Sequence, residues 1–133
     1  MKLLRHGPSG HEKPGLLDAE GRVRDLSHLI PDLAGKVLTP AGLDRLRALD
    51  VAGLPIVPGT PQQDLRLGPC VGHVGKFICI GLNYADHAAE SNMPIPAEPV
   101  VFAKWTSAIT GPDDVVEIPR GSHKTDWEVK LGV

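Results

Sequence analysis

A histidine and a glutamate in the second half of the chain could act together on a water molecule. His87 and Glu90 are three residues apart within residues 83–92, which the sequence predicts to be a short helix after a buried strand. At this spacing both side chains lie on one face of the helix. A carboxylate beside an imidazole fixes its tautomer and raises its basicity, so the pair could deprotonate water. A plain surface pair has the same spacing, so both interpretations stay open.

A second group of candidate residues lies near the end of the chain. Residues 126–133, DWEVKLGV, alternate with period two, which predicts a strand with Glu128 and Lys130 on one face. Two carboxylates at these positions could together coordinate a hard divalent cation. Lys130 instead puts a positive charge where a second ligand oxygen would be wanted. The alternative interpretation is an amphipathic strand whose Glu/Lys face is solvated.

The elements that must position these residues are short. Residues 76–81 predict a buried strand that leads into the helix at 83–92, and three prolines then force an extended loop. Residues 100–104 and 115–119 predict two further strands. Lys104 ends the first of these two and is most simply its exposed end.

The first half of the chain predicts strands, one tight turn and one helix. Gly21 supplies the positive φ that a hairpin turn needs. Thr39 and Pro40 predict a helix start, as N-cap and first helical residue, and the helix is expected to reach Asp50. Its apolar stripe consists of Leu43, Leu46 and Leu49. The strands are predicted at residues 2–5, 15–18 and 22–25.

The composition predicts a β-rich α+β fold in two parts. The 15 glycines and 13 prolines favour many short elements with frequent turns. Proline and glycine concentrate between residues 51 and 75, which indicates a boundary there. We expect a small N-terminal α+β domain at residues 1–60, a Pro/Gly-rich linker at 61–75 and a second domain at 76–133.

Charge and hydropathy exclude several classes of function. The net charge is −2 and the chain has no basic run, which argues against a nucleic-acid surface or an electrostatic membrane patch. The N-terminus lacks the apolar region of a signal peptide, and no apolar run approaches the roughly 18 residues of a membrane span. The two cysteines show no disulfide or metal spacing. We therefore expect a cytoplasmic protein.

Four ordered blocks of the second half resemble the fumarylacetoacetate hydrolase (FAH) family. They are FICIGLNYADHAAE at 77–90, EPVVFAK at 98–104, GP at 111–112 with VEIP at 116–119, and DWEVKLGV at 126–133. The leading segment, with PGLLD at 14–18 and IPD at 30–32, looks like the small N-terminal domain of the family's bacterial branch. Members of that branch are often called ureidoglycolate lyases or diketo-deoxy-sugar-acid hydrolases.

The resemblance implies a mixed β-roll around a Mg²⁺, Mn²⁺ or Ca²⁺ ion, usually in a homodimer, with Mg²⁺ or Mn²⁺ expected here. In the family, two carboxylates of a Glu-x-Glu strand and a later Asp hold the metal, which chelates an oxo-acid and polarises its carbonyl. By resemblance Glu128 is the first metal ligand, His87 with Glu90 activates the water, and Lys104 lies near the substrate. Lys130 takes the second ligand position, and the third ligand would lie beyond Val133.

The resemblance therefore predicts a divalent-metal-dependent hydrolase or lyase that acts on a small oxo-acid. Its reaction would be C–C bond hydrolysis or a ureidoglycolate-type lysis. The alternative is a non-catalytic truncated remnant or a partner-dependent fragment, because two of the three metal carboxylates and the closing strands are expected to be missing. We accordingly expect no measurable Mg²⁺ or Mn²⁺ binding by this chain at millimolar metal. Its open strand edges should also favour self-association.

Overall fold

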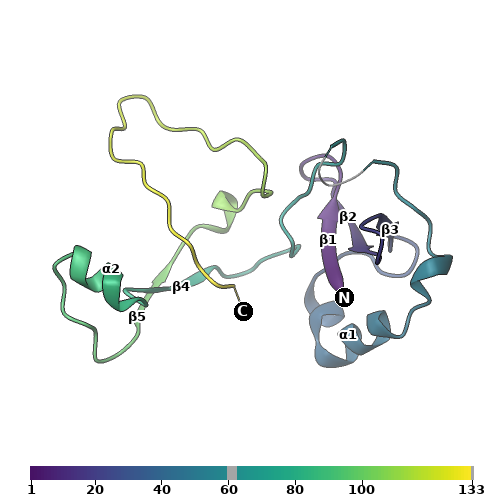
Figure 1. Ribbon diagram of the computed structural model, residues 1–133, viewed down its shortest axis with the longest axis horizontal. Coiled ribbons are helices and arrows are strands. Elements are labelled where there is room, and N and C mark those ends of the chain that lie inside the picture. Colours follow the sequence, from purple (N-terminus) through teal and green to yellow (C-terminus); the bar gives the residue numbers. More distant parts are fainter. Residues whose placement is uncertain (60–62, 133) are drawn as a thin grey trace.

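The computed structural model describes residues 1–59 and 63–132 and has two antiparallel sheets with two short helices (Figure 1). This β-rich α+β class agrees with the prediction. The first sheet has the order β1-β2-β3, and the second pairs β4 with β5. The strands are β1 (Lys2–His6), β2 (Lys13–Leu17), β3 (Val23–Asp25), β4 (Ile78–Gly81) and β5 (Val100–Ala103), and the α-helices are α1 (Pro40–Arg47) and α2 (Ala85–Glu90).

The predicted hairpin and the predicted helix start are both confirmed. Gly21 has a φ of +77° in the turn between β2 and β3. The Asp18 carboxylate accepts hydrogen bonds from the backbone N–H groups of Glu20 and Arg22, which closes this turn. At α1 the Thr39 hydroxyl accepts from the backbone N–H of Gly42 at 3.3 Å. The helix ends at Arg47, three residues before the predicted end.

Aliphatic side chains from the first half of the chain form the core. Leu16 of β2 and Leu46 of α1 pack together with Leu26 and Leu33, and all four are buried. Leu49 packs against this core from the end of the predicted stripe. No helix in residues 1–59 and 63–132 is long and apolar enough to cross a membrane.

A chain of ion pairs ties later residues to the first sheet. Arg5 Nε lies 2.7 Å from Asp32 Oδ1, and Arg5 Nη2 lies 3.6 Å from Glu12 Oε2. Glu12 Oε1 is in turn 3.0 Å from Arg66 Nη1, and Arg66 Nη2 is 2.6 Å from Asp114 Oδ2. Asp114 accepts hydrogen bonds from the Arg66 side chain and from the Gly111 backbone. Both lower the pKa of its carboxyl, and the bond from Arg66 has the larger effect. A series of ion pairs through Arg66 therefore links β1 to the loop around residue 114.

The segment predicted to be a linker makes specific contacts where it is described. The backbone N–H of Gly68 donates to Arg5 O, and that of Gly72 donates to Leu33 O. Thr60, the expected last residue of the first domain, and Pro61 and Gln62 of the linker lie outside the described residues. The division into domains at 1–60 and 76–133 stays a prediction.

His6 gives the first sheet a pH-dependent stability. Its side chain is buried, and burial lowers the pKa of its imidazole. Asp25 of β3 acts in the opposite direction, and Lys13 of β2 lowers this pKa further. The unfolded chain therefore takes up a proton at higher pH than the folded chain does. Stability is fully present above the ordinary value of 6.5 and falls as the pH drops from there towards the folded pKa.

We expect the free energy of unfolding to decrease from about pH 7 to about pH 5, and His6→Leu to remove most of this decrease. Urea denaturation followed by far-ultraviolet circular dichroism measures the free energy of unfolding at both pH values. His11 is exposed, so His11→Gln is the matched control and should keep the full decrease. An equally steep decrease in His6→Leu would show that another group is responsible.

The second half of the chain confirms three predicted elements and corrects two. β4 and β5 pair antiparallel from Ile78 opposite Ala103 to Gly81 opposite Val100, and α2 lies between them in sequence. The strands predicted at 115–119 and 126–133 are wrong over their described residues, which have no regular structure; Val133 lies outside these residues. An alternating pattern can give a strand one apolar and one polar face. A strand also needs a neighbouring strand whose backbone groups form hydrogen bonds with its own. In the described part of the chain neither segment has such a neighbour.

Candidate functional site

A sharp turn between β4 and α2 presents the helix beside the second sheet. Leu82 follows β4 directly and has a φ of +47°, which is uncommon for a residue with a side chain. Tyr84 is the extended N-cap residue of α2, and the backbone N–H of Ala88 donates to Tyr84 O at 3.1 Å. Ala88 is buried and anchors the helix, so the opposite face of α2 is left for His87 and Glu90.

The predicted pair of His87 and Glu90 forms on this helix. His87 Nδ1 lies 2.8 Å from Glu90 Oε1, which is a short hydrogen bond. Because a carboxylate only accepts hydrogen bonds, Nδ1 carries the proton and Nε2 of a neutral ring is left as the acceptor. A ring in this tautomer can take a proton from water. The geometry therefore suits the predicted chemistry, and the catalytic role itself stays a prediction.

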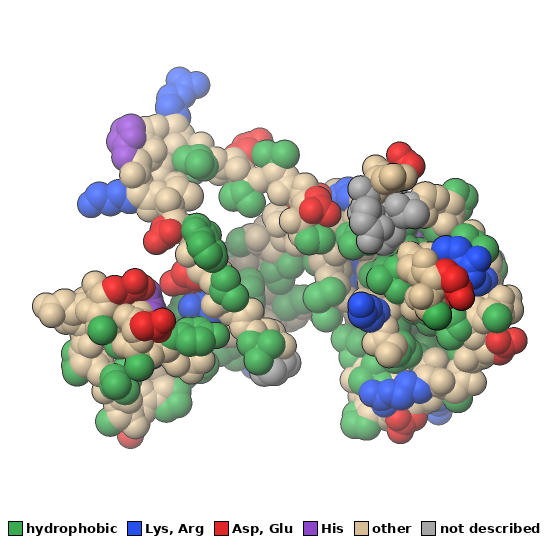
Figure 2. Space-filling model, viewed as in Figure 1, with side chains coloured by type: hydrophobic (Ala, Val, Ile, Leu, Met, Phe, Trp, Pro, Cys, Tyr) green, Lys and Arg blue, Asp and Glu red, His purple; other side chains and the backbone are tan. Residues whose placement is uncertain are grey.

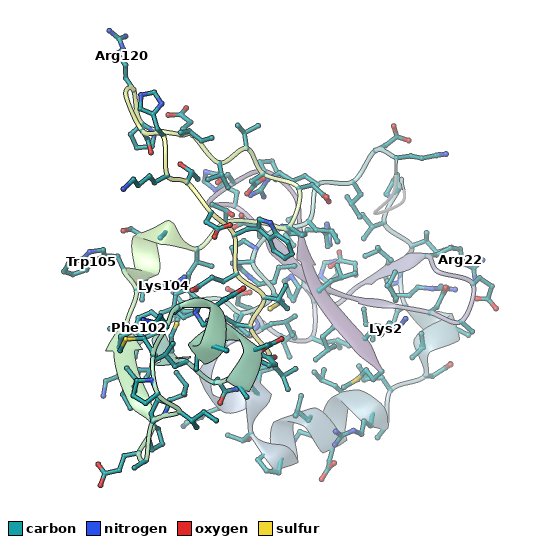
Figure 3. The ribbon with its side chains drawn as sticks, turned by 60° about the vertical axis from the view of Figure 1, so that its left-hand side comes forward. Lys2, Arg22, Phe102, Lys104, Trp105 and Arg120 are labelled. Atoms are coloured by element: carbon teal, nitrogen blue, oxygen red, sulfur yellow. The ribbon has the colours of Figure 1, made fainter. Side chains whose placement is uncertain are left out.

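Glu128 and two lysines form the second part of the site. Glu128 Oε2 lies 3.3 Å from Lys130 Nζ and 3.8 Å from Lys104 Nζ. Lys104 follows β5 directly, and its backbone N–H donates to Phe77 O, which fixes it beside the start of β4. Figure 3 shows Lys104 at the end of β5, next to α2. Lys130 contacts Glu128 although residues 126–132 have no regular structure.

All predicted site residues line one cavity of about 670 Å³. This volume is within the range of small-molecule sites, about 300–1,000 Å³. Figure 2 shows acidic side chains gathered around basic and histidine side chains at the end of the molecule that carries α2. Sequence reasoning missed the other lining side chains; for Asp86, adjacency to His87 was an available signal. The lining residues are Tyr84, Asp86, His87, Glu90, Lys104, Lys124, Asp126, Trp127, Glu128, Val129 and Lys130.

A second cavity of about 540 Å³ lies along β4. Its walls are residues 76–80, Asn83 and Tyr84 on one side and residues 130–132 on the other. Figure 1 shows the last residues of the chain crossing β4. Lys130 lines both cavities, and its ammonium contacts Glu128.

The residues present do not make a divalent-metal site. Glu128 is the predicted first ligand, but it contacts two ammonium groups, and the three groups together carry a net charge of +1. A divalent cation about 4 Å from one ammonium is repelled by about 2 kcal/mol at the dielectric constant of water and by about 8 kcal/mol at an effective value of 20. Within residues 1–59 and 63–132 no three His, Cys, Asp or Glu side chains are grouped so that they could hold a metal ion.

Comparisons with known proteins agree with the resemblance seen in the sequence. Residues 76–133 match the family model described as "Fumarylacetoacetate (FAA) hydrolase C-terminal", a family that is generally metal-dependent. This match over residues 76–133 confirms that the second half of the chain resembles that family.

Curated relatives from Burkholderia match the whole chain. The protein named "Putative hydrolase" from B. cenocepacia (strain HI2424) is 71% identical over 133 residues, and those of B. lata and B. multivorans are each 70% identical. Each alignment covers 100% of this chain and 46% of the relative. The chain thus spans about half the length of the curated relatives that it matches.

Proposed function

We propose that this protein takes part in hydrolysis of a C–C bond in a small oxo-acid, as a hydrolase of the FAA hydrolase family. The observation that carries the proposal is the 2.8 Å bond between His87 Nδ1 and Glu90 Oε1 on the wall of a substrate-sized cavity. The family match over residues 76–133 and the relatives named as hydrolases support the same class of reaction.

The chain's own residues supply a proton path for this reaction. His87 Nε2 takes a proton from a water molecule, the water oxygen forms a bond to the substrate's carbonyl carbon, and the π pair of that carbonyl moves onto its oxygen. The carbonyl then re-forms as the C–C bond breaks, the C–C electron pair stays on the leaving carbon, and that carbon takes the proton from His87. Glu90 holds the imidazole in one tautomer and stabilises the imidazolium between these two transfers. Lys104 offers an ammonium to the acid group of the substrate.

A second candidate function is that of a partner-dependent fragment, which lacks activity alone. Apolar side chains on the second sheet support it, since Ile78 is 58% exposed and Val101 is 63% exposed on adjacent strands. Contiguous exposed apolar surface marks a site of interaction.

One assay series separates the two candidates. The 133-residue chain is incubated with a panel of small oxo-acids, alone and after mixing with a polypeptide made of the rest of the B. cenocepacia relative. Release of the product acid is followed by NMR. Hydrolysis by the chain alone supports an independent enzyme, and hydrolysis only in the mixture supports the partner-dependent fragment. A lack of hydrolysis in both, with a folded mixture, would contradict the proposed function.

A further inference from the structure

We propose that Lys104 and Lys130 together bind a carboxylate of the ligand and that this binding needs no divalent metal ion. The assignment rests on the proposed function for the identity of the ligand, an oxo-acid, because it places the acid group of that ligand in the same cavity. It gives Lys130 a role in recognition, at the position where the family resemblance leads one to expect a metal-binding carboxylate.

The first step is the distance between the two ammonium groups. Both contact the same oxygen, Glu128 Oε2, at 3.8 Å for Lys104 and 3.3 Å for Lys130. The two Nζ atoms therefore lie no further apart than the sum of these distances, 7.1 Å. A carboxylate that accepts one charge-assisted hydrogen bond of about 2.8 Å from each ammonium can bridge such a gap.

The second step is the local charge. One carboxylate, Glu128, stands between two ammonium groups, so this trio carries a net charge of +1. Each ammonium has three N–H donors and no acceptor, and contact with one oxygen of Glu128 leaves donors on both lysines for another anion. Within this trio an incoming carboxylate balances the charge, whereas a divalent cation adds to it. The other charged side chains of the cavity lining are Asp86, Glu90, Asp126 and Lys124, so the positive charge is confined to the trio.

The third step is access and support. The side chains of Lys104 and Glu128 are 44% and 45% exposed, so a ligand can reach them. The Lys130 side chain is 32% exposed, and the residue also lines the cavity along β4. His87 lines the same cavity as both lysines. A substrate held by its acid group at the lysine pair would thus lie in the space that His87 also faces.

Calorimetric titration of the full 133-residue chain with 2-oxoglutarate tests the proposal. We expect binding in EDTA, weakening with added NaCl, and less than a threefold change in affinity when Mg²⁺ replaces EDTA. Lys104→Met and Lys130→Met should each weaken binding roughly tenfold or more, because each removes one charged hydrogen bond. Lys130→Arg, which keeps the charge, should recover most of the affinity. Lys36→Met is the control, since Lys36 is exposed and lies outside the cavity lining, and it should change affinity less than threefold.

Two results would overturn the proposal. One is binding that appears only with Mg²⁺, which would make Glu128 a metal ligand. The other is the absence of 2-oxoglutarate binding in both conditions by a chain whose circular dichroism shows it folded. Binding is measured separately from turnover. If 2-oxoglutarate still binds but no oxo-acid is hydrolysed, the proposed function is refuted and the role of the two lysines is retained. If hydrolysis is unchanged in both lysine variants, the role of the lysines is refuted and the proposed function is retained.

Discussion

Replacing His87 by glutamine should lower kcat for oxo-acid hydrolysis by roughly 10²- to 10⁴-fold, the usual contribution of a positioned general base. Glutamine has a similar length and can still donate a hydrogen bond to Glu90, so α2 should keep its structure. Its side-chain amide cannot take a proton from water at neutral pH. The loss should therefore appear in kcat, while the dissociation constant for 2-oxoglutarate stays within about threefold, since the lysine pair is intact.

The measurement uses whichever form is active, the chain alone or its mixture with the complementing polypeptide. His123→Gln is the matched control, because His123 is exposed and lies outside the cavity lining, and it should retain full activity. If His87→Gln keeps more than about a tenth of the wild-type kcat, a different group activates the water and the role assigned to His87 is wrong.

Truncation of a core leucine should have the largest effect on stability. Leu33 is fully buried and packs with Leu16, Leu26 and Leu46. Leu33→Ala removes apolar contacts and leaves a cavity, which should lower the free energy of unfolding by about 2–5 kcal/mol. At about 4 °C per kcal/mol for a chain of this length, the melting temperature should fall by roughly 8 °C or more.

Urea denaturation followed by far-ultraviolet circular dichroism measures this loss. Leu29 is close in sequence and 52% exposed, so Leu29→Ala is a fair control and should stay within about 0.5 kcal/mol of wild type. Equal losses in the two variants would show that burial at residue 33 does not determine the stability of this core.

The elements that the sequence predicted well are those fixed by local chemistry. The start of α1 depends on the hydroxyl of Thr39 and the ring of Pro40, and the hairpin turn depends on the positive φ of Gly21; all three act within a few residues. The strand at 126–133 failed because strand formation depends on a neighbour, which an alternating pattern does not provide. The ion pairs through Arg66 could not be predicted from the sequence either, because Arg66 and Asp114 are 48 residues apart.

In the site, too, the local contact was predicted from the sequence and the contacts between separate segments were not. The pairing of His87 with Glu90 follows from helical spacing, and the structure has it. The meeting of Lys104 with Glu128 joins residues on separate segments, and motif order placed them in one site without indicating direct contact. Lys130 was expected to obstruct a metal site. Its ion pair with Glu128 forms in a segment without regular structure, where an alternating pattern does not determine which side chains meet.

The two tryptophans give the molecule a built-in optical reporter. Trp105 and Trp127 are 85% and 79% exposed, and both belong to the second half of the chain, whereas the leucine core of the first half contains neither. A polypeptide that covers the second sheet or fills the cavity lined by Trp127 would move an indole out of water and shift its fluorescence emission. Assembly could therefore be followed without a label, while melting of the leucine core would leave the emission nearly unchanged.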